Sequence, residues 1–212
     1  MEITAKRLNI RLGRTCNCNC NHCTMRDVPT ADDLSFSEAV RIAAEKFAEG
    51  CREIVIMREA SLWRKLPEFV VEVKNIGYEL IQMQTNGRIF AERAFAERMA
   101  QAGLTNAEVN VFAARKGSGD AIMQVPGAQL QVLSGIRNLL ELGVEVLAVI
   151  PTLKSNLEEL NLLVRLLFSM KVGFVQFNFP RPVYADEVWH IDPLPSLSAA
   201  SAAVRPAMKL AD

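Results

Sequence analysis

The chain has 212 residues, which is enough for one well-packed domain or two small ones. Half of the residues are hydrophobic and 23% are charged, as in ordinary globular proteins. The formal net charge is zero, so the sequence offers no general attraction to nucleic acid or to an anionic membrane. The N-terminus lacks the pattern of a signal peptide, and no apolar run approaches the roughly 20 residues of a membrane span. We therefore expect a cytoplasmic protein that binds neither membranes nor nucleic acid.

Short apolar runs alternate with longer amphipathic ones, which predicts alternating strands and helices. The predicted strands are 8–13, 52–57, 78–87, 106–113, 144–151 and 173–180, and the predicted helices are 35–50, 66–77, 91–103, 127–143 and 156–170. A weaker helix is predicted within 195–212, interrupted by Pro206, and "RKGSG" (115–119) predicts a flexible loop. We find no repeat, linker or break in composition. We expect one domain over 1–212, with a strand-and-helix core over about 8–180 and a tail with a helix over 181–212.

Strands joined by helices of this length pair in parallel through right-handed crossovers, which predicts an α/β fold. Such a sheet either stays open or curls into a barrel. In both cases ligands bind at the carboxyl ends of the strands. The segments that follow the first four predicted strands contain a cysteine cluster, "MREAS", "TNGR" and "FAARKG". These segments are therefore expected to lie at one end of the sheet.

Four of the five cysteines lie in "RTCNCNCNHC", directly after the first predicted strand. Their crowding argues against a framework of disulfides and favours metal-bound thiolates in a reducing compartment. Cys16, Cys20 and Cys23 have the spacing C-x3-C-x2-C. Three thiolates on one loop can hold three irons of a cubane and leave the fourth iron open.

Zinc is the alternative occupant of this loop. It would take three or four ligands from Cys16, Cys18, Cys20, His22 and Cys23. A structural zinc site is usually assembled from two separated pairs of ligands. No second pair is evident here, because Cys51 is alone and His190 lies far away in the sequence. The spacing therefore favours an iron–sulfur cluster over zinc and leaves both open.

The position of C-x3-C-x2-C after the first strand resembles the radical S-adenosylmethionine (radical SAM) superfamily. In that superfamily the second strand often ends in a Gly-Gly-Glu-Pro-like motif, and Met57-Arg58-Glu59-Ala60-Ser61 occupies this place. The stretches "IQMQTNGR", "VPGAQLQVLSGIRNLLELGV" and "VQFNFPRP" also resemble one branch of these enzymes. The similarity covers roughly residues 8 to 185.

The resemblance implies a partial (β/α)6 TIM-like barrel that contains a [4Fe–4S] cluster and binds S-adenosylmethionine at the open iron. By the superfamily's pattern, Cys16, Cys20 and Cys23 would ligate the cluster. Reductive cleavage of S-adenosylmethionine would give a 5′-deoxyadenosyl radical that abstracts hydrogen from an unidentified substrate. An external flavodoxin-like or ferredoxin-like protein would supply the electron.

Four further residues match positions that contact the cofactor in the superfamily. Glu59, with Arg58 beside it in the motif, would accept the methionine ammonium, a charge-assisted contact. Asn110 falls where a polar side chain often faces the ribose or the methionine carboxylate. His22 replaces the residue that packs near the adenine. The pairs Gln84 with Asn86 and Gln176 with Asn178 would face the lumen of the barrel.

Three departures from the pattern leave other functions open. Met57 and Ala60 replace the glycine and proline of the second-strand motif, and Met57 is expected to crowd the methionine moiety. Cys18 is expected to be a spectator thiol, although as a fourth ligand it would close the open iron. The alternatives are a non-catalytic member of the same fold and a zinc-binding module. Cys51 is expected to be a small buried side chain.

Overall fold

The computed structural model describes residues 6–13, 15–23, 33–185, 188–190 and 193–210. Its main feature is a sheet of six parallel strands in the order β1-β2-β3-β4-β5-β6, so each strand pairs with the next one in the chain. The strands are β1 (Arg7–Ile10), β2 (Glu53–Ile56), β3 (Leu80–Thr85), β4 (Asn106–Asn110), β5 (Glu145–Pro151) and β6 (Phe174–Asn178). The α/β class and the parallel pairing are confirmed. In the described part of the chain β1 and β6 do not pair, so the barrel is partial.

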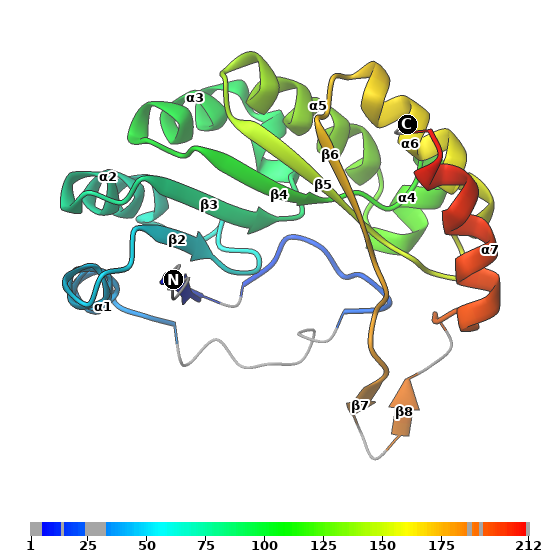
Figure 1. Ribbon diagram of the computed structural model, residues 1–212, viewed down its shortest axis with the longest axis horizontal. Helices are drawn as coiled ribbons and strands as arrows, with labels where there is room; N and C mark the ends of the chain where they lie inside the picture. The colour runs from blue at the N-terminus through cyan, green and yellow to red at the C-terminus, as the bar shows by residue number, and fades with distance from the viewer. Residues whose placement is uncertain (1–5, 14, 24–32, 186–187, 191–192, 211–212) are drawn as a thin grey trace, which may run out of the picture.

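The helices follow the strands and cover the outer side of the curved sheet (Figure 1). They are α1 (Phe36–Ala48), α2 (Leu66–Ile76), α3 (Arg93–Ala102), α4 (Lys116–Met123), α5 (Ala128–Glu141), α6 (Leu160–Ser169) and α7 (Leu197–Met208). Two 3-10 helices, η2 (Arg88–Ala91) and η3 (Leu157–Glu159), precede α3 and α6. Helix α1 has a side-chain N-cap, since the Ser35 hydroxyl accepts a hydrogen bond from the Glu38 amide at 3.3 Å.

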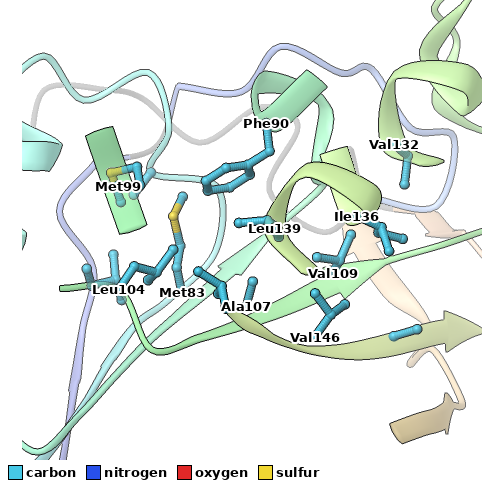
Figure 2. Close-up of a cluster of buried hydrophobic side chains, with 14 of the residues drawn as sticks. Met83, Phe90, Met99, Leu104, Ala107, Val109, Val132, Ile136, Leu139 and Val146 are labelled. Carbon is cyan, nitrogen blue, oxygen red and sulfur yellow. The ribbon is translucent and has the colours of Figure 1, made fainter. Parts of the chain in front are cut away.

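The two faces of the sheet differ because side chains alternate along each strand. On β3, Ile81 and Met83 are buried beneath the helices, whereas Gln82 and Gln84 face the opposite, inner side. Figure 2 shows the outer core, in which side chains from β3, β4 and β5 pack against η2, α3 and α5. The inner face is thus polar on β3, as predicted for the lumen, whereas Val149 of β5 makes part of that face apolar.

The structure corrects the prediction of a flexible loop at 115–119, because this segment begins helix α4. The glycines of this segment suggested a loop, but one of them, Gly119, permits close packing. A Cβ atom on Gly119 would lie 2.3 Å from Oε1 of Gln129 on α5. The N-terminal end of α4 is held by Glu159 of η3, whose carboxylate accepts hydrogen bonds from the amides of Ala114 and Arg115 at 3.1 and 2.9 Å.

The C-terminal tail also differs from its prediction. Helix α7 continues through Pro206 and packs against α6 and η3. An antiparallel pair, β7 (Val183–Ala185) and β8 (Val188–His190), precedes it and had no signal in the sequence. No described helix is long and apolar enough to cross a membrane. The single domain over 1–212 stays a prediction.

Candidate functional site

The cysteine loop follows β1 and is anchored to the end of α4. The amide of Asn19 donates to the carbonyl of Met123 at 3.1 Å, and the amide of Asn21 donates to that of Ile122 at 3.2 Å. These carbonyls belong to the last turn of α4, where they have no partner within the helix. The loop and the helix end therefore satisfy each other's backbone groups, which fixes the loop at the mouth of the barrel.

A second anchor comes from the segment that follows β3. The Asn86 side-chain amide donates to Oδ1 of Asn17 at 2.7 Å and to Sγ of Cys16 at 3.6 Å. The Arg88 guanidinium donates to the carbonyl of Asn17 and to Sγ of Cys18, the latter at 3.6 Å. The "TNGR" stretch therefore holds the first half of the cysteine loop.

The thiols of this loop crowd one another. Hydrogen bonding with Cys18 and burial raise the pKa of Cys16 above its ordinary value. A hydrogen bond with Cys16 lowers the pKa of Cys18, but contact with the Cys20 thiol and burial outweigh it and raise that pKa to about 11. A bound cation would stabilise the thiolate forms, as metals do at coordinating thiols.

The donors of the cysteine loop share one cavity, Cys18 and His22 included. Cys16, Cys20 and Cys23 all line one cavity. Among the described residues, no group of three or more His, Cys, Asp or Glu side chains is arranged to hold one metal ion. Three thiolates on one loop can bind three irons of a cubane. The thiols of Cys16, Cys20 and Cys23 therefore fit a [4Fe–4S] cluster.

Glu59 lies at the end of β2, in the same cavity as the cysteines. Its Oε2 accepts hydrogen bonds from the Asn86 amide at 2.7 Å and from the Thr85 hydroxyl at 3.0 Å. Its Oε1 accepts one from the Ser61 amide at 3.0 Å. A carboxylate offers about four acceptor positions. Three protein donors therefore fix Glu59 and leave one position for a cationic ligand.

The two residues before Glu59, Met57 and Arg58, have different surroundings. Arg58 has a φ of 65°, a left-handed conformation that glycine adopts more easily. Its side chain is exposed and lines the cavity together with Glu59. Met57 is not among the described residues that line the cavity, and its amide extends the pairing with β1 by donating to the Ile10 carbonyl at 2.8 Å. The crowding of the methionine moiety by Met57 stays a prediction.

The cavity has a volume of about 600 Å³ and opens onto the inner face of the sheet. Gln84 and Asn86 of the β3 end, Asn110 of β4 and Asn178 of β6 all line it, whereas Gln176 does not. Glu108 of β4 lines it too, and this carboxylate accepts hydrogen bonds from the side chains of Gln82 and Gln84. The lining is thus polar at β3 and β4, whereas Val149 and Pro151 of β5 add an apolar wall.

His22 lies against the apolar part of the cavity wall. Its ring makes an edge contact with Phe112, with centroids 5.1 Å apart. Burial lowers the pKa of His22 to about 4, so the ring is neutral near pH 7. Its Nδ1 is buried without a hydrogen-bond partner in the described structure. A neutral, partly buried ring of this kind suits packing against a flat ligand.

The structure thus brings Cys16, Cys20, Cys23, His22, Arg58, Glu59 and Asn110 to one cavity. Cys51 is 6% exposed and lies in the core, as predicted. Sequence reasoning missed Arg88, Glu108 and Arg181, which also reach the cysteine loop or the cavity. Arg88 and Glu108 lie at or near the ends of strands, and this position in the sequence could have marked them as candidates for the site.

A family model of the radical SAM superfamily matches residues 10–167, well over half of the chain. Similar curated proteins include the "Probable GTP 3′,8-cyclase" of Sulfolobus acidocaldarius, 29% identical over 106 residues that make up 49% of this chain and 33% of the relative. The protein of the same name from Metallosphaera sedula is 26% identical over 175 residues, 81% of this chain and 54% of the relative. The chain thus spans between a third and about half of these relatives.

Solved structures share the fold at low identity. SuiB of Streptococcus suis bound to S-adenosylmethionine has a TM-score of 0.78 and 13% identity, over 97% of this chain and 48% of that one. Methylornithine synthase (PylB) has a TM-score of 0.72 and 12% identity, over 97% of this chain and 62% of that one. The expected partial TIM-like barrel is confirmed.

Proposed function

The chain belongs to the radical SAM superfamily, whose members use a [4Fe–4S] cluster and S-adenosylmethionine, and we propose that Cys16, Cys20 and Cys23 hold that cluster here. When bound, the cluster supplies the electron that cleaves S-adenosylmethionine into methionine and a 5′-deoxyadenosyl radical. The observation that carries the proposal is that the three cysteines and Glu59 line one cavity, in which Asn86 contacts both Glu59 and Cys16.

The chain's own residues would bind and orient S-adenosylmethionine. Glu59 has one free acceptor position for the methionine ammonium, and its other contacts keep the carboxylate in place. Asn110 would hydrogen-bond the ribose or the methionine carboxylate, and Arg58 supplies a cation at the same wall. His22 and Phe112 would pack against the adenine.

We propose Cys18 as a spectator thiol. Its Sγ accepts a hydrogen bond from Arg88 at 3.6 Å, and its own thiol is within 3.8 Å of Oδ1 of Asn17. Cys18 lines the same cavity as the other three thiols of the loop, but these two contacts already occupy its sulfur. The open iron would therefore stay available to S-adenosylmethionine.

The electron donor would be a separate protein of the flavodoxin or ferredoxin kind. Cys16 and Cys23 are exposed, so a cluster at this loop would lie near the surface, within reach of a small redox partner. The names of these relatives refer to GTP cyclisation, but this chain spans at most 54% of their length. The proposal is accordingly restricted to cleavage of S-adenosylmethionine and hydrogen abstraction from a substrate.

The test is anaerobic reconstitution with iron and sulfide, followed by reduction with dithionite in the presence of S-adenosylmethionine. We expect a brown protein that releases 5′-deoxyadenosine. The variant Cys20→Ala should lose both the colour and the product, whereas the matched control Cys51→Ala should keep both. Brown protein without product would favour a non-catalytic member of the fold. Colourless protein with stoichiometric zinc would refute the cluster.

A further inference from the structure

Asn86 is held so that its side-chain amide can point in one direction only. Its backbone amide donates to Oε2 of Glu59 at 2.7 Å, and its Oδ1 accepts a hydrogen bond from the Arg88 amide at 3.0 Å. The Nδ2 end must therefore face Asn17 and Cys16, to which it donates at 2.7 and 3.6 Å. The residue is 8% exposed, so water does not compete strongly for these contacts.

This geometry links the two halves of the proposed site. Glu59, proposed to bind the methionine ammonium, and Cys16, proposed to ligate iron, both contact the same asparagine. Their separation in the sequence is large, since Cys16 lies 70 positions before Asn86. Asn86 therefore contacts both a carboxylate that follows β2 and a cysteine that follows β1.

The contact with Cys16 also has an electronic consequence. Hydrogen bonds to the cysteine sulfurs are one of the factors that set the reduction potential of an iron–sulfur cluster. Reduction adds negative charge to the cluster and its sulfurs, and an N–H donor stabilises this charge. We infer that Asn86 is a positioning residue that raises the reduction potential of the cluster, an inference that rests on the proposed function.

The cysteine loop has other anchors that remain when the Asn86 side chain is changed. Arg88 still holds the Asn17 carbonyl and Cys18, and its Nε is fixed by Oε1 of Gln131 at 2.7 Å. Helix α4 still holds the amides of Asn19 and Asn21. Replacement of Asn86 is therefore expected to change the electrostatics of the loop more than its position.

The experiment is a potentiometric titration of the reconstituted full chain. The state of the cluster is monitored by its visible absorbance and its electron paramagnetic resonance signal. Asn86→Ala removes the donor, and Asn86→Asp also adds a negative charge. The reduction potential should fall in the order wild type, Asn86→Ala, Asn86→Asp. For Asn86→Asp we expect about a tenfold drop in the ratio of reduced to oxidised cluster at a fixed solution potential, which is a shift of about 59 mV for one electron.

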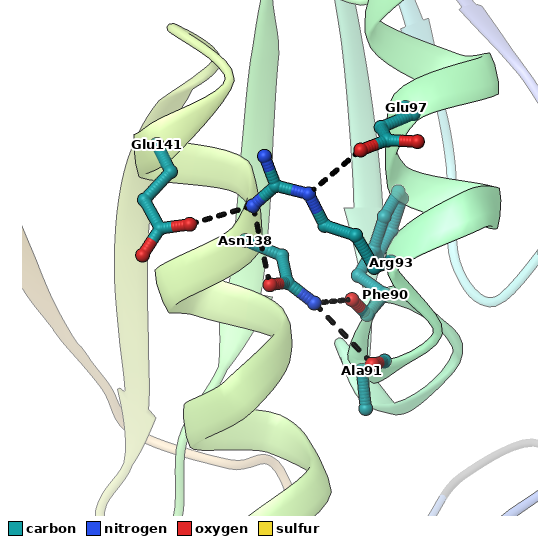
Figure 3. A network of polar contacts seen from close by, with 6 residues as sticks. All are labelled: Phe90, Ala91, Arg93, Glu97, Asn138 and Glu141. Atoms are coloured by element: carbon teal, nitrogen blue, oxygen red, sulfur yellow. Dashed lines mark hydrogen bonds and ion pairs between the residues drawn. The ribbon is translucent and has the colours of Figure 1, made fainter.

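Asn138→Asp is the matched control. Asn138 donates to the carbonyls of Phe90 and Ala91 at 2.8 and 3.3 Å, and its Oδ1 accepts from Arg93 (Figure 3). It thus holds the same η2 segment that follows Asn86, but from the side of α3 and α5. Asn138→Asp should leave the potential unchanged.

Equal potentials in wild type and both Asn86 variants would overturn the inference. It would also be wrong if Asn138→Asp shifted the potential as much as Asn86→Asp, since the effect would then come from the segment as a whole. If neither Asn86 variant held iron while Asn138→Asp did, Asn86 would be needed for assembly rather than for the potential. A wild-type chain that took up no cluster would refute the proposed function instead.

Discussion

Replacing Glu159 tests the contacts that hold the N-terminal end of α4, the helix whose last turn anchors the cysteine loop. This carboxylate is 4% exposed and accepts hydrogen bonds from the amides of Ala114 and Arg115, from the Ser118 hydroxyl and, as an ion pair, from the Arg115 guanidinium at 3.4 Å. Glu159→Ala leaves two backbone donors without their partner. A buried donor without a partner costs about 1–3 kcal/mol. Because Arg115 is exposed, its amide can donate to water instead, so most of the cost comes from the amide of Ala114. We expect a loss of about 2 kcal/mol in the free energy of unfolding.

The pH dependence gives the same prediction a second readout. Burial by itself would raise the pKa of Glu159, but the hydrogen bonds from Ser118 and Arg115 outweigh it and lower that pKa below 4.5. A carboxyl with a lowered pKa stabilises the fold above its unfolded-state pKa, and this stability is lost as the pH falls through the folded-state pKa. The difference between wild type and Glu159→Ala should therefore be full at pH 7 and should shrink below about pH 4.5.

The measurement is urea denaturation of the chain without a cluster, at pH 7 and at acidic pH. Unfolding is monitored by circular dichroism. Glu158→Ala is the matched control, because Glu158 is the adjacent exposed residue. A surface change of this kind should stay within about 0.5 kcal/mol of wild type. Equal stability of the two variants at pH 7, or a difference for Glu159→Ala that does not vary with pH, would refute the reasoning.

Three further predictions concern the loop and its supports. Cys18→Ala should keep the iron content of the reconstituted protein, measured by colorimetric iron analysis, and loss of iron would show that the wrong three thiols are assigned. In Gly135→Ala the new Cβ would lie 2.3 Å from the Gly87 carbonyl, so we expect a loss of about 1–3 kcal/mol by urea denaturation. Arg58→Gly relieves a left-handed conformation that costs a non-glycine residue roughly 1–2 kcal/mol of folding free energy. Glycine also raises the conformational entropy of the unfolded chain, which lowers the free energy of unfolding by about 0.4–1 kcal/mol. A net gain of about 0.5–1 kcal/mol should follow, and a lower melting temperature would contradict it.

The order of the elements was predictable because each strand and helix has its own local pattern. Short apolar runs marked all six strands of the sheet, and helices between them required parallel pairing. That topology places the segments after the strands at one end, so the shared position of the cysteine loop and Glu59 followed from the sequence as well.

Helix α4 was missed because its stability comes from distant residues. Its glycines disfavour a helix locally. The carboxylate of Glu159, more than forty positions along the chain from Ala114 and Arg115, holds its N-terminal end, and Gln129 packs over Gly119. Tertiary contacts thus override the local preference, and no window of sequence contains both partners.

The sequence by itself determined the fold class, the spacing of Cys16, Cys20 and Cys23, and the end of the sheet at which they lie. Only the tertiary structure decided how that loop is held, because the side-chain amide of Asn86 and the guanidinium of Arg88 reach it from the segment that follows β3. Hydrogen-bond partners depend on positions to within an ångström, whereas local patterns fix only the order and type of the elements.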